Sequence, residues 1–224
     1  MMLLIIVVAA LWPKASNAGV PVLDTTGHKV VIGGLYEIRE VININGKDVI
    51  GGGLVDVIER PYPNCTSTPG DPFEPCCVGI VGKVANESLL GVTVAISQNK
   101  ALNLSPIIVS TDINITGDVP FYHIPGSCGG GHQWGFKYDE KSRQYLVMSG
   151  KDCCGTPPAF HGRSWFRVVK SGKHYGILGC YRLCMSCKAV CNGIGYKIIR
   201  GHKLLTFSDV PSKFVFRREL ENRT

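Results

Sequence analysis

Residues 22–38 read V-L-D-T-T-G-H-K-V-V-I-G-G-L-Y-E-I. Gly27 follows Asp24 by three residues, Val30 adds an aliphatic position, and a Tyr-x-Ile pattern closes the stretch at Ile38. Taken by itself, this pattern predicts a strand, a turn and a second strand.

The rest of the chain also predicts short strands separated by frequent turns. Asn45-Gly46 separates two runs rich in β-branched residues, a strong hairpin signal because both positions tolerate positive φ. The 27 Gly and 13 Pro punctuate the chain as expected for a sandwich or barrel. Further hairpin turns are predicted at residues 171–173 and 200–202, and residues 62–75 are interpreted as a long loop. Strands are predicted at residues 37–43, 107–115, 144–148, 165–170 and 175–181, and residues 87–104 as strand and loop. The expected fold class is therefore all-β with about a dozen strands, although no threefold sequence repeat is visible.

The first 18 residues predict a secretory signal peptide. An apolar run is followed by Ser16-Asn17-Ala18, the small-residue spacing that signal peptidase recognises. The run is too short to span a bilayer as a helix. We expect cleavage after Ala18, leaving residues 19–224 as one domain that is secreted, or vacuolar after passage through the secretory pathway, with no membrane partner.

Cysteine usage and glycosylation sequons agree with export. The chain has 10 Cys, an even number that suggests five disulfides in a secreted protein. Five N-x-[ST] sequons are present. They begin at Asn64, Asn86, Asn103, Asn114 and Asn222, and we expect glycans at Asn86, Asn103 and Asn114.

The formal net charge is +7, and removal of Lys14 with the signal would lower it by one. The basic residues are scattered, with denser groups at residues 197–203 and 213–218 that are interleaved with strand residues. This pattern favours a solvated β surface. No basic helix or nucleic-acid-binding module is recognisable, so we expect no nucleic-acid partner. Attraction to anionic glycans or acidic partners stays open.

Residues 22–38 resemble the N-terminal signature of the plant Kunitz family, the soybean trypsin inhibitor type. Matching patterns continue through Gly51-Gly52-Gly53-Leu54, the S-T-D-I-N-I run at residues 110–115 and the W-F-R-V run at residues 165–168. They end with Gly193-Ile194-Gly195 and residues 200–208, and the clustered carboxyl-terminal cysteines look closest to the miraculin-like branch. The resemblance implies a disulfide-rich β-trefoil that inhibits proteases.

The resemblance also implies disulfide pairings. The first would join Cys76 or Cys77 to Cys128, and the second would join Cys180 to Cys191. Cys184 and Cys187 would form the extra bridge of miraculin-like members. Cys65, the remaining member of the Cys76/Cys77 pair, Cys153 and Cys154 stay unassigned, and each adjacent pair is expected to bond in two directions because bonding between neighbours is strained.

Other chemistries receive less support. The Cys180, Cys184, Cys187 and Cys191 series could hold zinc, and Cys184-x-x-Cys187 could be a redox pair, but an oxidising compartment favours disulfides. The histidines are spread out, Gly-rich residues 129–132 lack a phosphate-loop continuation, and no nucleophile elbow or carboxylate pair is present. We therefore expect no enzyme, no cofactor and no metal.

The resemblance places the protease-binding loop at about residues 86–93. Leu89 or Leu90 is expected to be P1, the side chain that fills the enzyme's specificity pocket. The flanking residues would be Ser88, Gly91, Val92 and Thr93. Residues 84–99 contain no Lys or Arg, and trypsin's pocket needs one, so the expected target is a chymotrypsin- or subtilisin-like protease.

The family's loop-supporting Asn falls here at Ile32, which cannot make the same hydrogen bonds. This departure favours the alternative of a non-inhibitory storage, defence or taste-modifying binding protein. Inhibition of a cysteine or aspartic protease through another loop is the remaining alternative. A monomer that binds a protein partner, the protease, is expected in the leading interpretation.

Overall fold

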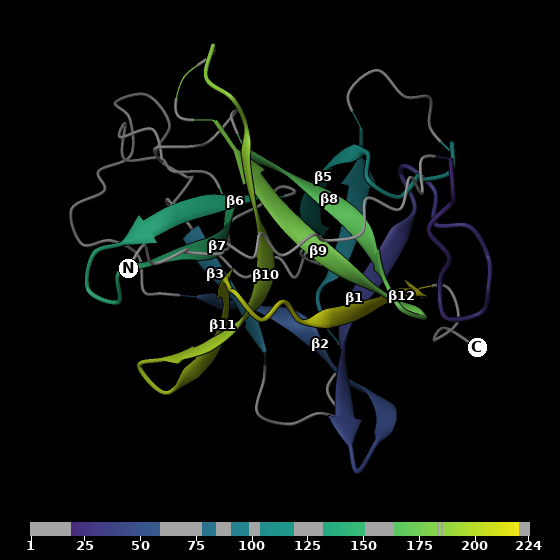
Figure 1. Ribbon diagram of the computed structural model, residues 1–224, viewed down its shortest axis with the longest axis horizontal. Coiled ribbons are helices and arrows are strands. Elements are labelled where there is room, and N and C mark those ends of the chain that lie inside the picture. The colour runs from purple at the N-terminus through teal and green to yellow at the C-terminus, as the bar shows by residue number, and fades with distance from the viewer. Residues whose placement is uncertain are drawn as a thin grey trace, which may run out of the picture.

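A computed structural model describes residues 19–58, 78–83, 91–98, 104–118, 132–150, 164–182, 184 and 186–219. Regular structure in this part of the chain consists of twelve β-strands (Figure 1). Their bounds are β1 Leu35–Ile44, β2 Lys47–Ile58, β3 Val78–Lys83, β4 Thr93–Ser97, β5 Asp112–Asp118, β6 His132–Asp139, β7 Gln144–Gly150, β8 Ser164–Ser171, β9 His174–Tyr181, β10 Val190–Ile199, β11 His202–Phe207 and β12 Lys213–Arg218. The expected signal peptide lies outside the described residues.

Half of the strands close into a barrel. The antiparallel pairings run β1–β4, β4–β5, β5–β8, β8–β9, β9–β12 and β12–β1, so the ring returns to its starting strand. Closure pairs both edges of each barrel strand and so leaves no free barrel edge. In Figure 1, β1 and β12 lie side by side where the ring closes.

The other strands form three hairpins that cap the barrel. The hairpins are β2–β3, β6–β7 and β10–β11, and strands β3, β7 and β11 pair with one another as a triangle. Each successive group of four strands therefore supplies two barrel strands and one hairpin. This threefold arrangement is the β-trefoil that the resemblance implied. It is visible in the strand pairing, although the sequence shows no threefold repeat.

The core fills the barrel and the space beneath the cap. Its largest fully buried side chains are aromatic or aliphatic, and they come from strands far apart in the sequence. β8 shows the alternation clearly, because Phe166 and Val168 point inward while Trp165 and Arg167 are partly exposed. Strand alternation thus leaves polar and aromatic side chains on the outer wall of the barrel.

The predicted turns are confirmed. Asn45 and Gly46 have φ values of 52° and 79°, Gly172 has 62°, and Arg200 and Gly201 have 51° and 80°. The strand predicted at residues 107–115 begins only at Asp112. Ser110 interrupts it, because its φ of 68° turns the chain out of the extended conformation.

Within residues 22–38, Asp24 organises the predicted turn. Its Oδ1 accepts hydrogen bonds from the backbone N–H of Thr26 (3.0 Å), the backbone N–H of His28 (2.9 Å) and the Thr26 hydroxyl (2.7 Å). Burial raises the pKa of Asp24, but these hydrogen bonds and the charge of Arg218 outweigh it and lower the pKa below 3.8. The carboxylate is therefore the charged centre of the turn.

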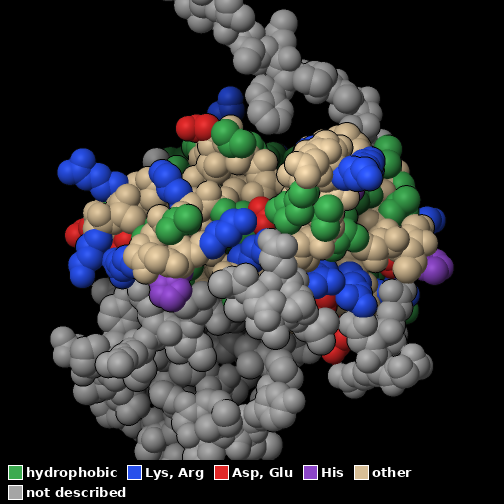
Figure 2. Space-filling view, turned by 90° about the horizontal axis from the view of Figure 1, so that it is seen from below, with side chains coloured by type: hydrophobic (Ala, Val, Ile, Leu, Met, Phe, Trp, Pro, Cys, Tyr) green, Lys and Arg blue, Asp and Glu red, His purple; other side chains and the backbone are tan. Residues whose placement is uncertain are grey.

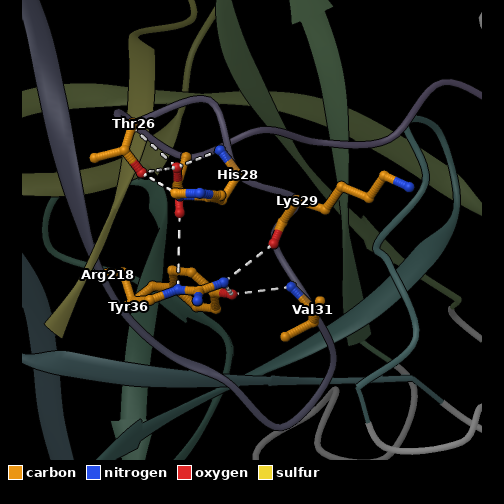
Figure 3. A network of polar contacts seen from close by, with 7 residues as sticks. Thr26, His28, Lys29, Val31, Tyr36 and Arg218 are labelled. Carbon is orange, nitrogen blue, oxygen red and sulfur yellow. Dashed lines mark hydrogen bonds and ion pairs between the residues drawn. The ribbon is translucent and has the colours of Figure 1, made fainter. Parts of the chain in front are cut away.

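The same turn is tied to the last strand (Figure 3). Arg218 Nε of β12 lies 3.8 Å from Asp24 Oδ2, and the same guanidinium donates to the Lys29 carbonyl (3.3 Å) and the Tyr36 hydroxyl (3.5 Å). That hydroxyl also accepts a hydrogen bond from the Val31 N–H (3.0 Å). The family-like signature is thus scaffold that joins the two ends of the fold.

Two implied disulfides are confirmed, Cys180–Cys191 and Cys184–Cys187. Cys180 and Cys191 are direct cross-strand partners in β9 and β10, so the first bridge reinforces their pairing. The other six cysteines, Cys65, Cys76, Cys77, Cys128, Cys153 and Cys154, lie outside the described residues. No helix in the described part of the chain is long and apolar enough to cross a membrane.

Candidate functional site

The expected protease-binding loop lies between β3 and β4. β3 ends at Lys83, and the described chain resumes at Gly91. Ser88, Leu89 and Leu90 lie outside the described residues, as do the expected glycosylation sites Asn86 and Asn103. The identity of P1 therefore stays a prediction, and the structure describes the two anchors of the loop.

Both anchors converge on Leu54 of β2. On one side, Lys83 is the cross-strand partner of Leu54 in the β2–β3 ladder. On the other side, the Val92 N–H donates a 2.6 Å hydrogen bond to the Leu54 carbonyl. The Leu54 side chain is buried in the core, so this meeting point is itself immobilised. The loop therefore leaves from and returns to one fixed residue.

The returning anchor requires a glycine. A Cβ placed on Gly91 would lie 2.7 Å from the Gly53 Cα and 2.9 Å from both the N and the O of Leu54. All three atoms belong to the backbone, which cannot rotate aside as a side chain would. Gly91 is thus where the chain presses directly against β2.

Thr93 already belongs to the barrel. It pairs with Glu37 of β1 on one side and with Asp118 of β5 on the other. Gly91, Val92 and Thr93 are all half-buried. Of the expected loop residues, these three therefore form the anchor on the barrel side.

A buried ionic cluster supports the opposite anchor. Glu40 Oε2 accepts hydrogen bonds from Lys83 Nζ and Lys203 Nζ, both at 2.9 Å. Lys203 Nζ also lies 4.4 Å from the ring centroid of Tyr196, and burial, followed by the Glu40 charge, raises the pKa of that tyrosine well above 10.0. Sequence reasoning missed this cluster, because isolated charges in strands are usually solvent-exposed.

Glu37 is a second buried carboxyl near the loop. Its side chain is 4% exposed, and Oε2 lies 3.9 Å from Arg39 Nε and has no hydrogen-bond partner among the described residues. Burial raises the pKa of Glu37 above 4.5, although the charges of Arg39 and Arg217 oppose the change and Glu219 adds to it. The residue that pairs with Thr93 thus carries a carboxyl that keeps its proton to a higher pH than a solvent-exposed glutamate does.

Ile32 occupies the core. Its side chain is 3% exposed, and its backbone exchanges hydrogen bonds with Leu104 and Ser105 (both 2.9 Å). The position where the family carries a loop-supporting Asn therefore contributes packing here, and the described support for the loop comes from the two Leu54 anchors.

The described residues give no support for a metal site. Among the described residues, no group of three or more His, Cys, Asp or Glu could hold a metal ion. Lys and Arg side chains are spread between hydrophobic and uncharged ones over the face in Figure 2. This distribution agrees with the interpretation of a solvated β surface.

Comparisons with known proteins point in one direction. The legume Kunitz profile, described as trypsin and protease inhibitor, matches residues 22–218. Kunitz trypsin inhibitor 5 of Arabidopsis thaliana is 28% identical over 200 residues, covering 88% of this chain and 85% of that protein.

Two solved structures illustrate the likeness of fold. The soybean trypsin inhibitor in its complex with porcine pancreatic trypsin superposes with a TM-score of 0.62 at 20% identity, covering 89% of this chain and 99% of that one. A bifunctional α-amylase/subtilisin inhibitor from Oryza sativa gives 0.54 at 22% identity, covering 88% and 98%.

Proposed function

Because this chain belongs to the legume Kunitz family of trypsin and protease inhibitors, we propose that it is a secreted inhibitor of a serine protease that prefers apolar P1 residues. In this proposal the chain binds the protease and catalyses no reaction itself. The segment between Lys83 and Gly91 occupies the enzyme's cleft. Leu89 or Leu90 fills the enzyme's specificity pocket, and the protease is the protein partner of this chain.

The convergence of both anchors on Leu54 carries this proposal. An inhibitor of this kind must present an extended segment that is already ordered, since ordering it during binding would cost affinity. It must also keep the ends of the segment together. The Lys83 pairing and the Val92 hydrogen bond support the second need, because they hold the two ends of the segment together at one buried residue.

The absence of Lys and Arg from residues 84–99 sets the specificity. Trypsin's pocket ends in a carboxylate and binds a cationic side chain, whereas chymotrypsin-like pockets are hydrophobic. The soybean inhibitor is solved in complex with trypsin and the rice protein is an α-amylase/subtilisin inhibitor, so the fold serves more than one protease.

Inhibition constants against chymotrypsin, subtilisin and trypsin test the proposal. Wild-type protein should inhibit one of the first two and not trypsin, and the double substitution Leu89→Asp/Leu90→Asp should weaken inhibition by orders of magnitude. The matched control is Ile198→Asp/Val210→Asp, which changes two side chains that are 78% and 81% exposed elsewhere. Equal inhibition by both double variants and the wild type would refute the loop assignment.

The buried Ile32 favours a second candidate, a non-inhibitory binding, storage or defence protein. A panel of serine, cysteine and aspartic proteases separates the candidates. Inhibition of a serine protease supports the first, inhibition of only a cysteine or aspartic protease implies another loop, and no inhibition supports the second. Amino-terminal sequencing of the mature protein from a eukaryotic host should begin at Gly19 if the expected signal peptide is removed.

A further inference from the structure

A polar cavity of about 790 Å³ lies on the outer wall of the barrel. It is lined by the residue after β4, by β5 and the two residues before it, by β6 and β8, and by the residue after β9. Gln98, which follows β4, is part of this lining, whereas Thr93 at the other end of β4 belongs to the loop anchor. The cavity and the expected protease-binding loop are therefore separate features. A volume in this range is typical of sites for small ligands.

Among the described residues that line the cavity, one positive charge has no ion-pair partner. Arg167 of β8 forms an ion pair with its cross-strand neighbour Asp112 of β5. Arg182 is exposed and lies over the Trp165 ring, with its guanidinium carbon 5.4 Å from the ring centroid. No carboxylate of the described residues forms an ion pair with Arg182. A guanidinium stacked on an aromatic face keeps its in-plane N–H donors available for an anion.

The stacked pair is held by the disulfide framework. Trp165 pairs with Cys180 across β8 and β9, and Arg182 comes two residues after Cys180. Cys180 is bonded to Cys191, and Cys184 is bonded to Cys187, so Arg182 lies between two cross-linked residues. Preorganisation of this kind lowers the cost of ordering a binding group.

Side-chain amides complete the lining. Asn114 of β5 and Gln133 of β6 both face the cavity, and the Gln133 amide donates to Asn114 Oδ1 at 3.4 Å. Each amide offers both a donor and an acceptor, the combination that matches a sugar hydroxyl. Amide and hydroxyl groups dominate the wall, which suits a polyhydroxylated ligand better than an apolar peptide side chain.

We infer that this cavity binds an acidic oligosaccharide of the uronic acid class. A sugar carboxylate pairs with Arg182, and neighbouring hydroxyls bond to Asn114 and Gln133. The inference therefore requires that the Asn114 sequon carry no glycan in the native protein, contrary to the expectation from the sequence. The single uncompensated charge matches one carboxylate and does not match the dense charge of a sulfated chain. This activity is additional to the proposed protease inhibition and does not use the loop.

Calorimetric titration with trigalacturonate tests the inference. The full chain is produced in an oxidising bacterial compartment, because Asn114 belongs to a sequon and a glycan there would meet the ligand. Wild-type protein should bind trigalacturonate, and maltotriose, which lacks the carboxylates, should bind at least tenfold more weakly. Arg182→Ala should weaken trigalacturonate binding by about tenfold or more, because loss of a charge-assisted hydrogen bond has an effect of this size. Arg182→Lys keeps the positive charge and should weaken binding by less.

The matched control is Lys197→Ala, which removes one exposed positive charge from β10, away from the cavity lining. It should bind as the wild type does. Two results would show a general attraction of polyanions and overturn the inference. One is equal weakening of trigalacturonate binding by Lys197→Ala and Arg182→Ala. The other is tighter binding of a heparin-derived tetrasaccharide that Arg182→Ala does not affect. No heat of binding at millimolar trigalacturonate would also overturn it. Protease inhibition should be the same in all variants, so the two functions can fail separately.

Discussion

Replacing Gly91 with alanine should loosen the returning anchor of the loop. The added Cβ would lie 2.7 Å from the Gly53 Cα and 2.9 Å from the N and O of Leu54. All these distances are shorter than the van der Waals contact distance between a methyl carbon and another atom. The obstructing atoms belong to the backbone. The chain must therefore move away from β2, which stretches or breaks the Val92 hydrogen bond to Leu54.

The magnitude follows from overpacking. Forcing a methyl group into a filled space costs about 1–3 kcal/mol. For a domain of this size, a loss of about 2 kcal/mol corresponds to a fall in Tm of roughly 4–8 °C. Inhibition should weaken as well, because each loop residue released from order costs about 1–2 kcal/mol when it is ordered again in the complex. That cost is roughly a tenfold increase in the inhibition constant for each released residue.

Thermal unfolding and inhibition of the target protease measure the two effects on one preparation. Gly176→Ala in β9 is the matched control, because its Cβ would meet only one methyl group, Val169 Cγ2 of β8, at 3.2 Å. It should change Tm and inhibition little. A Gly91→Ala protein with the Tm and inhibition constant of the wild type would refute the argument that the loop is anchored by close backbone packing.

Substitutions at three further positions test the buried charges. Glu37→Gln should be more stable than wild type near pH 7 and equally stable near pH 4. Because the pKa of Glu37 is raised in the folded state, the stability of the wild type falls as pH rises from 4.5 through the folded pKa. Urea titrations of both proteins at pH 4 and pH 7 measure the effect. Equal stability of wild type and Glu37→Gln at both pH values would mean that the glutamate is freely solvated. Asp24→Ala should lose about 3 kcal/mol, because two backbone donors lose their acceptor, whereas Asp24→Asn keeps Oδ1 and should lose less. The lowered pKa of Asp24 also makes wild-type stability fall as pH drops below 3.8, and this component should be absent in Asp24→Asn. Glu40→Gln should cost about 3 kcal/mol in urea unfolding, since it leaves Lys83 and Lys203 without their shared carboxylate, and an unchanged midpoint would contradict the buried ion pairs.

Local signals predicted local structure well. Asn45-Gly46 forms the predicted hairpin, because its two positive φ values are a property of these residues and need no partner. The family resemblance likewise predicted the Cys180–Cys191 and Cys184–Cys187 bridges. At residues 107–115 the strand was predicted to begin too early, because β propensity says nothing about the positive φ of Ser110.

Long-range features escaped prediction. The charge pattern favoured a solvated surface for the basic residues and gave no sign of a buried ionic cluster, yet Glu37, Glu40 and Lys83 are buried. Nothing near Leu54 in the sequence indicates that residues 83 and 92 meet there. Arg182 and Trp165 are likewise brought together only by the pairing of β8 with β9.

The sequence by itself determined the all-β character, the positions of the hairpin turns and the membership of an inhibitor family, since turn geometry and strand preference reside in neighbouring residues. Tertiary structure alone decided that six strands close into a ring, that both ends of the candidate loop rest on one buried leucine, and that a cationic sugar-sized cavity forms on the wall. The physical reason is that burial and charge pairing depend on which strands become neighbours, and that choice is made by the packing of the whole chain.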